Sequence, residues 1–144
     1  MILSPKTQQK IERIVSVYEA RIFVELTSLN SFSIMETQDH LRAVPDCPTE
    51  VRLPNQWGGV WSNTWFKTTF EIDESLIGKT LFIQPQTDGI ETMLWVDGLP
   101  QGIISKELEV GARGYHHTLM IGSDFSKGDK VSIALECYAG HPCI

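Results

Sequence analysis

Two stretches of strict alternation between apolar and polar side chains constrain this chain more than any other feature of its sequence. The first is Phe66–Ile72, with Phe66, Thr68, Phe70 and Ile72 on one face. The second is Val131–Tyr138, with Val131, Ile133, Leu135 and Cys137 on one face. A period of two is typical of β-strands that bury one face and expose the other. The sequence therefore predicts a sheet with an apolar inner face and a solvated outer face.

Shorter alternating runs separated by turn residues extend this pattern. They are Leu81–Pro85, Met93–Val96, Leu99–Ile104 and Tyr115–Ile121. The dipeptide Asp97-Gly98 readily adopts the positive φ angles of a two-residue hairpin, so we expect the runs on either side of it to pair. Five or six strands with short polar turns predict a mainly β fold, an antiparallel β-sandwich of jelly-roll or galactose-binding-like type.

A helical pattern occupies the N-terminal part of the chain instead. Ser4 and Pro5 supply an N-cap and a favoured first helical residue. Apolar residues then recur at helical spacing, at Ile11, Ile14, Val15, Tyr18, Ile22 and Leu26. We expect a helix over about 6–26 that docks on the sandwich through this strip. A second strip, formed by Val17, Ala20 and Val24, is expected to meet another domain or another chain.

The length of 144 residues is in the ordinary range for one domain. We divide it into an N-terminal helical segment, 1–30, a connecting segment, 31–56, and the β-sandwich, 57–141. In the connecting segment Pro45, Pro48 and Pro54 forbid a long helix and confine any strand to an edge.

Three tryptophans lie just before the first alternating stretch, at Trp57, Trp61 and Trp65. Their four-residue spacing would suit a helix, but the pair Gly58-Gly59 between the first two favours a loop. Such a cluster either seals one end of the sandwich or forms an aromatic platform for sugar rings. Trp57, Trp61 and Trp65 are therefore the candidate carbohydrate-binding residues.

Charge and cysteine content limit the partners and the compartment. The net charge of −6 and the pI near 5.1 come with scattered Lys and Arg, so nucleic acid is not an expected partner. Three cysteines without a C-x-x-C pair are typical of free thiols in a reducing compartment. No apolar run has the length of a signal segment or a membrane span. We expect a cytoplasmic protein with no membrane partner.

Catalytic and metal-binding patterns are weak. His116 and His117 are neighbours on a predicted strand and would point to opposite faces, and the tail residues His141 and Cys143 match no zinc spacing. The chain has neither a nucleophile elbow nor a phosphate-binding loop. We expect no catalytic residue, metal ligand or cofactor in this chain.

Several short motifs occur in a fixed order and together resemble one known family. They are WGG at Trp57, WFKTTFEI from Trp65, the Gly78-Lys79 turn, DGIETMLWVDG from Asp88, GYHH from Gly114, SKGD from Ser126 and LECYAGH from Leu135. In this order they resemble the N-terminal domain of glycoside hydrolase family 38 α-mannosidases, over about Trp57–His141.

The resemblance implies a β-sandwich ahead of a catalytic domain, in a cytoplasmic enzyme that removes α-linked mannose with a zinc ion and an aspartate nucleophile by a retaining mechanism. The zinc motif H-x-D-x-x-W and the nucleophile belong to that following domain, so no catalytic residue is carried over to this chain. We therefore expect a non-catalytic accessory or scaffold domain. Its partner would be the catalytic domain of the same polypeptide, which would hold the zinc.

Two other functions remain open at this stage. The jelly-roll pattern and the tryptophan cluster also fit a free-standing carbohydrate-binding module, with a sugar as the partner. The additional apolar strip of the N-terminal helix fits a protein-interaction domain or a homo-oligomer.

Overall fold

The computed structural model describes residues 4–53, 55–105 and 117–140, and leaves out the side chains of 19–21. One helix and eight strands follow each other along these residues. They are α1 (Pro5–Ile22), β1 (Ser31–Thr37), β2 (Thr49–Arg52), β3 (Asn63–Glu71), β4 (Leu81–Ile83), β5 (Glu91–Val96), β6 (Leu99–Ser105), β7 (Leu119–Gly122) and β8 (Lys130–Tyr138).

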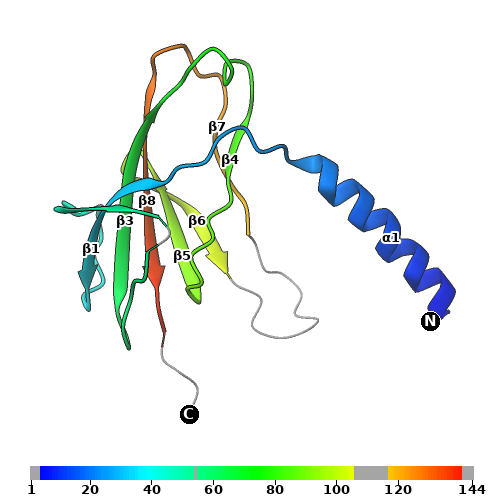
Figure 1. Cartoon of the computed structure of the whole chain (residues 1–144), viewed down its shortest axis with the longest axis horizontal. Coiled ribbons are helices and arrows are strands. Elements are labelled where there is room, and N and C mark those ends of the chain that lie inside the picture. The colour runs from blue at the N-terminus through cyan, green and yellow to red at the C-terminus, as the bar shows by residue number, and fades with distance from the viewer. Residues whose placement is uncertain (1–3, 54, 106–116, 141–144) are drawn as a thin grey trace.

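The strands form two antiparallel sheets (Figure 1). The larger sheet has the order β2-β1-β3-β8-β5-β6, and the smaller one pairs β4 with β7. Leu81 and Ile83 of β4 and Ile121 of β7 pack against the core that lines the larger sheet, so the two sheets enclose one apolar layer. The predicted mainly β, antiparallel sandwich with an N-terminal helix is confirmed.

The core lies on the inner face of the larger sheet. Its residues from that sheet are Phe32, Phe66, Leu94, Val96, Val131, Ile133, Leu135 and Cys137. All four inward residues expected in the last strand are buried, as the alternation predicted. Burial of this apolar layer is the main stabilising contribution to the fold.

The hairpin between β5 and β6 forms at the predicted dipeptide. Asp97 and Gly98 have φ angles of 50° and 80°, and Val96 pairs directly with Leu99. The Asp97 carboxylate accepts a hydrogen bond of 2.8 Å from the backbone N–H of Ser132, and the Asp97 N–H donates one of 2.8 Å to the Ser132 carbonyl. The tip of the hairpin is thereby attached to β8.

The expectation of a mere connecting segment over 31–56 is wrong, because this segment supplies β1 and β2. Phe32 and Ile34 of β1 face the core, whereas Met35 faces the outer side of the sheet. Only two apolar residues mark the inner face of β1, which is too short a pattern to distinguish a strand from a loop. Pro45 and Pro48 lie between the strands, and β2 lies at the sheet edge as expected.

Part of the outer face of the larger sheet is buried as well. Trp65 of β3 is fully buried, and its ring lies 5.6 Å from the ring of Trp95 in β5. Leu41, Val44 and Cys47, from the segment between β1 and β2, pack against this pair. The loop that joins the first two strands therefore covers a second, smaller apolar cluster.

Helix α1 begins where the sequence predicted and ends earlier. The Ser4 hydroxyl accepts a hydrogen bond of 3.3 Å from the Thr7 N–H, and Pro5 occupies the first turn. The helix ends at Ile22 because Phe23, with φ −120° and ψ 140°, is extended. A run of β-branched and aromatic residues at this point disfavours further helix.

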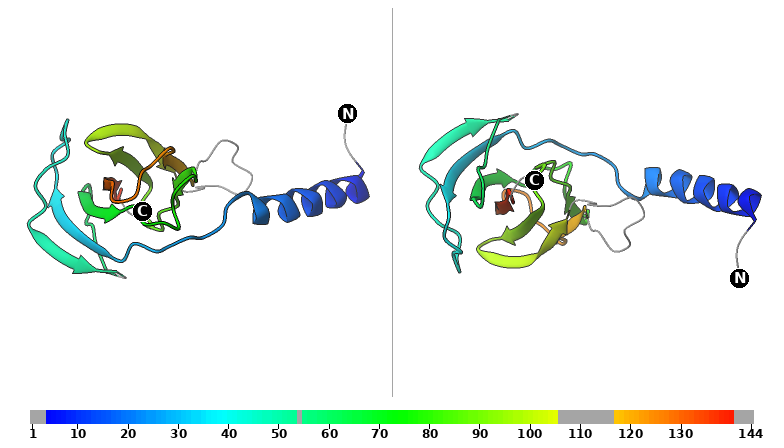
Figure 2. Two further views of the ribbon diagram at one scale, coloured as in Figure 1. Left: turned by 90° about the horizontal axis from the view of Figure 1, so that it is seen from above. Right: turned by 90° about the horizontal axis from the view of Figure 1, so that it is seen from below.

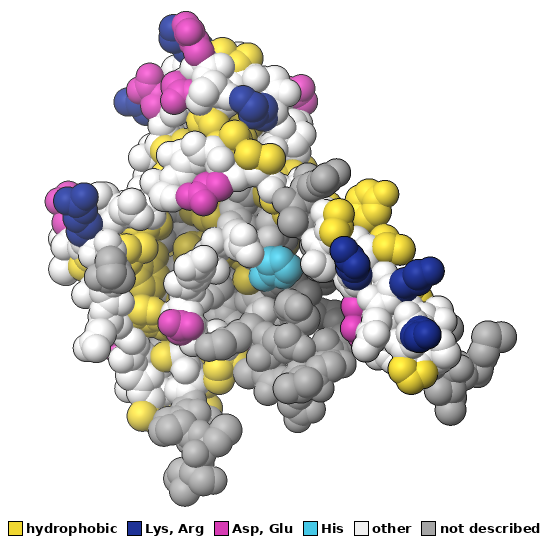
Figure 3. Space-filling model, turned by 45° about the vertical axis from the view of Figure 1, so that its right-hand side comes forward, with side chains coloured by type: hydrophobic (Ala, Val, Ile, Leu, Met, Phe, Trp, Pro, Cys, Tyr) yellow, Lys and Arg dark blue, Asp and Glu magenta, His cyan; other side chains and the backbone are white. Residues whose placement is uncertain are grey.

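The predicted docking of α1 on the sandwich is wrong. The helix projects away from both sheets (Figures 1 and 2), and its apolar strip is 45–66% exposed at Ile11, Ile14, Val15, Tyr18 and Ile22. Figure 3 shows apolar and cationic side chains together on the projecting helix. Phe23 contacts Phe82 of β4 at a ring distance of 5.0 Å. An amphipathic pattern predicts a helix with an apolar face but does not specify the surface that covers that face.

Truncation of the buried indole tests the second cluster. We expect Trp65→Ala to lower the free energy of unfolding by about 3 to 5 kcal/mol, because a large aromatic side chain leaves a cavity when it is removed from a packed site. Urea unfolding measures this, with Leu99→Ala as the control because Leu99 is 65% exposed. Equal stability of the two variants would contradict the burial of Trp65.

Candidate functional site

Trp57 closes one end of the sandwich. Its indole N–H donates a hydrogen bond of 2.9 Å to the carbonyl of Thr87, and its ring meets Phe66 edge-on at 5.6 Å. At Gly89 a Cβ atom would lie 3.0 Å from the Trp57 ring, so this approach favours glycine. The side chain is half-buried and has a packing role.

Trp61 is placed differently, on the loop that leads into β3. It is 58% exposed and has a φ of 61°, a conformation that favours glycine and is rare for bulky residues. Its backbone N–H donates a hydrogen bond of 2.9 Å to the Gly140 carbonyl. At Gly140, with φ 73°, a Cβ atom would collide with Ile90, which explains the glycine at this chain exit.

The three tryptophans therefore do not share one exposed surface. Trp65 lies under the segment between β1 and β2, and Trp57 lies between β3 and the turn before β5. Of the three, Trp61 alone is mostly exposed. The carbohydrate-binding role of these residues stays a prediction, and the geometry concentrates it on Trp61.

A groove of about 530 Å³ lies beside Trp61 on the outer face of the larger sheet. Strand register explains its composition, since Asn63 of β3, Tyr138 of β8 and Glu91 of β5 are paired across three neighbouring strands. Glu136 lies two residues further along β8 and therefore on the same face. The described wall is formed by Gln38, His40, Trp61, Asn63, Glu91, Met93, Ile103, Glu136 and Tyr138.

One acidic side chain in this groove, Glu136, is placed at a cost to stability. Burial raises the pKa of the Glu136 carboxyl, and the nearby Trp95 indole and His40 imidazole offset this only in part. The Trp95 N–H forms no hydrogen bond with any described residue, so the indole acts on the Glu136 carboxyl through the dipole of this N–H group. Asn63, which also lines the groove, is only 4% exposed.

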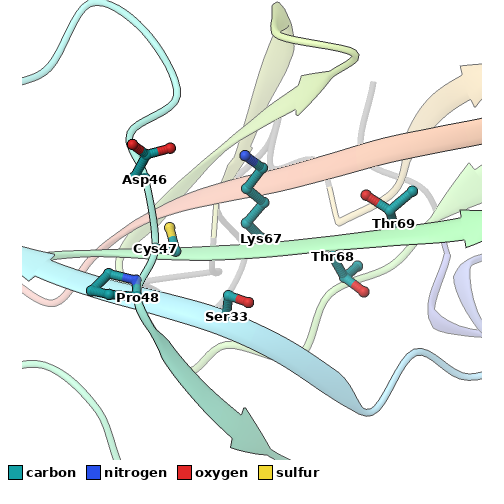
Figure 4. A pocket seen from close by; sticks show the side chains of 7 residues that line it. All are labelled: Ser33, Asp46, Cys47, Pro48, Lys67, Thr68 and Thr69. Atoms are coloured by element: carbon teal, nitrogen blue, oxygen red, sulfur yellow. The ribbon is translucent and has the colours of Figure 1, made fainter.

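A second, smaller hollow of about 290 Å³ lies on the same sheet near β1 and β3 (Figure 4). Lys67 of β3 and the sulfur of Cys47 point to the same side of the sheet, with Asp46 next to them. Burial raises the pKa of the Cys47 thiol more than Lys67 lowers it. The thiol therefore stays protonated at neutral pH and is a poor nucleophile.

The described residues do not provide a zinc site. Within 4–53, 55–105 and 117–140, no three His, Cys, Asp or Glu side chains come close enough together to hold a metal ion. Cys47 and Cys137 are free, as predicted, and burial raises the pKa of Cys137 to about 12. His117 is exposed. The predictions for His116, His141 and Cys143 lie outside the described residues.

Within the described ranges, no helix combines the length and the apolar character that crossing a membrane requires.

Sequence reasoning did not identify the groove. His40, Glu91, Glu136 and Tyr138 come from three distant stretches, and only the strand register brings them together. One signal was present: Glu136 and Tyr138 occupy alternate outward positions of the most regular strand.

The architecture defines a jelly-roll domain with a ligand-sized groove on the outer face of its larger sheet. The family model described as "alpha-mannosidase, jelly roll domain" matches residues 24–142. The chain belongs to this family, which confirms the predicted resemblance.

One protein to which the chain is similar is alpha-mannosidase 2C1 of Mus musculus. It is 28% identical to this chain over 112 residues, which cover 72% of the chain and 11% of the mouse protein. The chain thus spans a small part of the length of this relative.

The raised pKa of Glu136 predicts how stability depends on pH. The folded chain binds this proton more tightly than the unfolded chain does, so stability falls as the pH rises above about 4.5. We expect Glu136→Gln to raise the melting temperature at neutral pH, with the gain shrinking below about pH 4.5. Glu71→Gln, at an exposed position of β3, is the control. A lower melting temperature for Glu136→Gln at neutral pH would contradict this account.

Proposed function

We propose that this chain is a non-catalytic accessory domain of an α-mannosidase-type glycoside hydrolase, and that the parent enzyme hydrolyses terminal α-linked mannose. The match of residues 24–142 to an α-mannosidase jelly-roll family carries this proposal. The mouse relative supports it, because this chain aligns with only 11% of a protein named as an α-mannosidase. The domain would act as a scaffold beside a zinc-dependent, retaining catalytic domain in the same polypeptide.

The free cysteines favour the cytoplasm as the compartment of this protein. Cys47 and Cys137 are both free, and Cys137 lies in the apolar core beside Thr92, whose hydroxyl is 3.6 Å from the sulfur. A thiol held in this way needs no disulfide to stabilise the fold, as is common in reducing compartments.

Helix α1 offers the contact surface for the catalytic domain. Its strip at Ile14 and Tyr18 is exposed, whereas single-chain domains normally bury such strips. We take the catalytic domain of the same polypeptide as the partner. In its absence, a second copy of this chain would cover the strip.

The accessory role predicts no turnover by this chain alone. We expect the purified 144-residue chain to release no nitrophenol from an aryl α-mannoside, with or without added zinc, because the described residues provide no zinc site. A colorimetric assay measures this. Zinc-dependent hydrolysis that a chelator abolishes would contradict the proposal.

The partner surface predicts self-association through α1. We expect the sedimentation coefficient of the chain to increase with concentration, and Ile14→Lys combined with Tyr18→Lys to abolish this increase. Gln9→Lys with Ser16→Lys adds the same charge at exposed polar positions of α1 and should leave the increase unchanged. A strictly monomeric wild-type chain would contradict the use of this strip by a second copy.

A further inference from the structure

We propose that the groove beside Trp61 binds a neutral sugar ring, with the Trp61 indole as the stacking platform and Asn63, Glu91 and Glu136 as partners for the hydroxyls. This goes beyond an accessory role, because it makes the domain a sugar-binding element in its own right. The choice of an α-mannoside among neutral sugars rests on the proposed function.

The conformation of Trp61 is the first argument. Its φ of 61° is one that glycine adopts freely and bulky residues rarely adopt, and the residue is 58% exposed and lines the groove. A strained backbone at a mostly exposed residue reduces stability, which points to a role other than packing in the core. Such outliers gather at binding sites, and an indole face packs well on the apolar face of a pyranose.

The polar groups of the groove are the second argument. Asn63 is only 4% exposed as a residue, and it lines the groove. Amides both donate and accept, and carboxylates accept at two oxygens, so Asn63 with Glu91 and Glu136 can serve neighbouring hydroxyls that need both kinds of partner.

The charge and size of the groove further restrict the class of ligand that it can bind. The carboxylates of Glu91 and Glu136 repel anionic ligands. A cation accepts no hydrogen bonds, so it would leave the N–H donors of His40 and Asn63 without a partner. The volume of about 530 Å³ lies within the range of roughly 300 to 1,000 Å³ that is common for small-molecule sites. Apolar side chains of Met93, Ile103 and Tyr138 complete a lining of mixed character, as in other small-ligand pockets.

The backbone of Trp61 makes a discriminating variant available. Because glycine prefers this φ, Trp61→Gly should fold as stably as the wild-type chain or more so, and should still lose sugar binding. A purely structural role for the indole predicts the opposite, a clear drop in the melting temperature.

The experiment is a titration of the ¹⁵N-labelled 144-residue chain with methyl α-mannoside, followed by NMR, with methyl α-glucoside in a parallel series. We expect the indole N–H of Trp61 and the side-chain amide of Asn63 to shift. Trp61→Gly should weaken binding by about ten-fold or more, which corresponds to about 1.4 kcal/mol, and Glu91→Gln should weaken it less. Leu99→Ala, an exposed apolar position at the far hairpin, should bind as the wild type does.

Absence of binding to both glycosides, or binding that Trp61→Gly leaves unchanged, would overturn the proposal. Binding of the glucoside alone would support the sugar groove and overturn the assignment to mannosides. Neither result depends on hydrolysis, so a failure of the groove and a failure of the accessory role are distinguishable.

Discussion

The pairing of β3 with β8 is the interaction on which the rest of the structure depends. The two strands stay in register over nine positions, from Asn63–Tyr138 to Glu71–Lys130, at the centre of the larger sheet. Their inner side chains build the main core, and Trp65 and Ala134 build the smaller cluster on the opposite face. The β5–β6 hairpin is attached to β8, and β1 and β2 are attached to β3. A shift of this register by one residue would move the inner side chains of the shifted strand to the outer face.

The same register divides the outer face of the sheet into two parts. Along β3 and β8, Trp65 lies under the segment between β1 and β2, whereas Asn63, Glu136 and Tyr138 line an open groove next to Trp61. The covered part gains stability from packing. The open part carries the partly buried carboxylate of Glu136, which reduces stability. Stability given up at one end of a well-packed sheet is characteristic of a binding surface, which is the reason for assigning sugar binding to this end.

The sequence predicted those features whose physical cause is local. Alternation revealed the regular strands, Asp97-Gly98 revealed the hairpin, and the ordered motifs identified the family. Features that depend on distant contacts were missed. The strand β1 has too few apolar residues to be recognised from its own sequence. The exposed face of α1 shows that an apolar strip on a helix does not specify the surface that covers it. The groove escaped prediction because Glu91 and Glu136 become neighbours only through the β5–β8 register.

The central claim is that the outer face of the larger sheet is covered at Trp65 and open to a sugar beside Trp61. A crystal structure of the chain grown with an α-linked mannobiose tests this claim most directly. The account predicts one pyranose ring stacked on the Trp61 indole, with hydroxyls within hydrogen-bond distance of the Asn63 amide and the Glu136 carboxylate. A groove filled by the chain itself, or a sugar bound only elsewhere on the molecule, would contradict it.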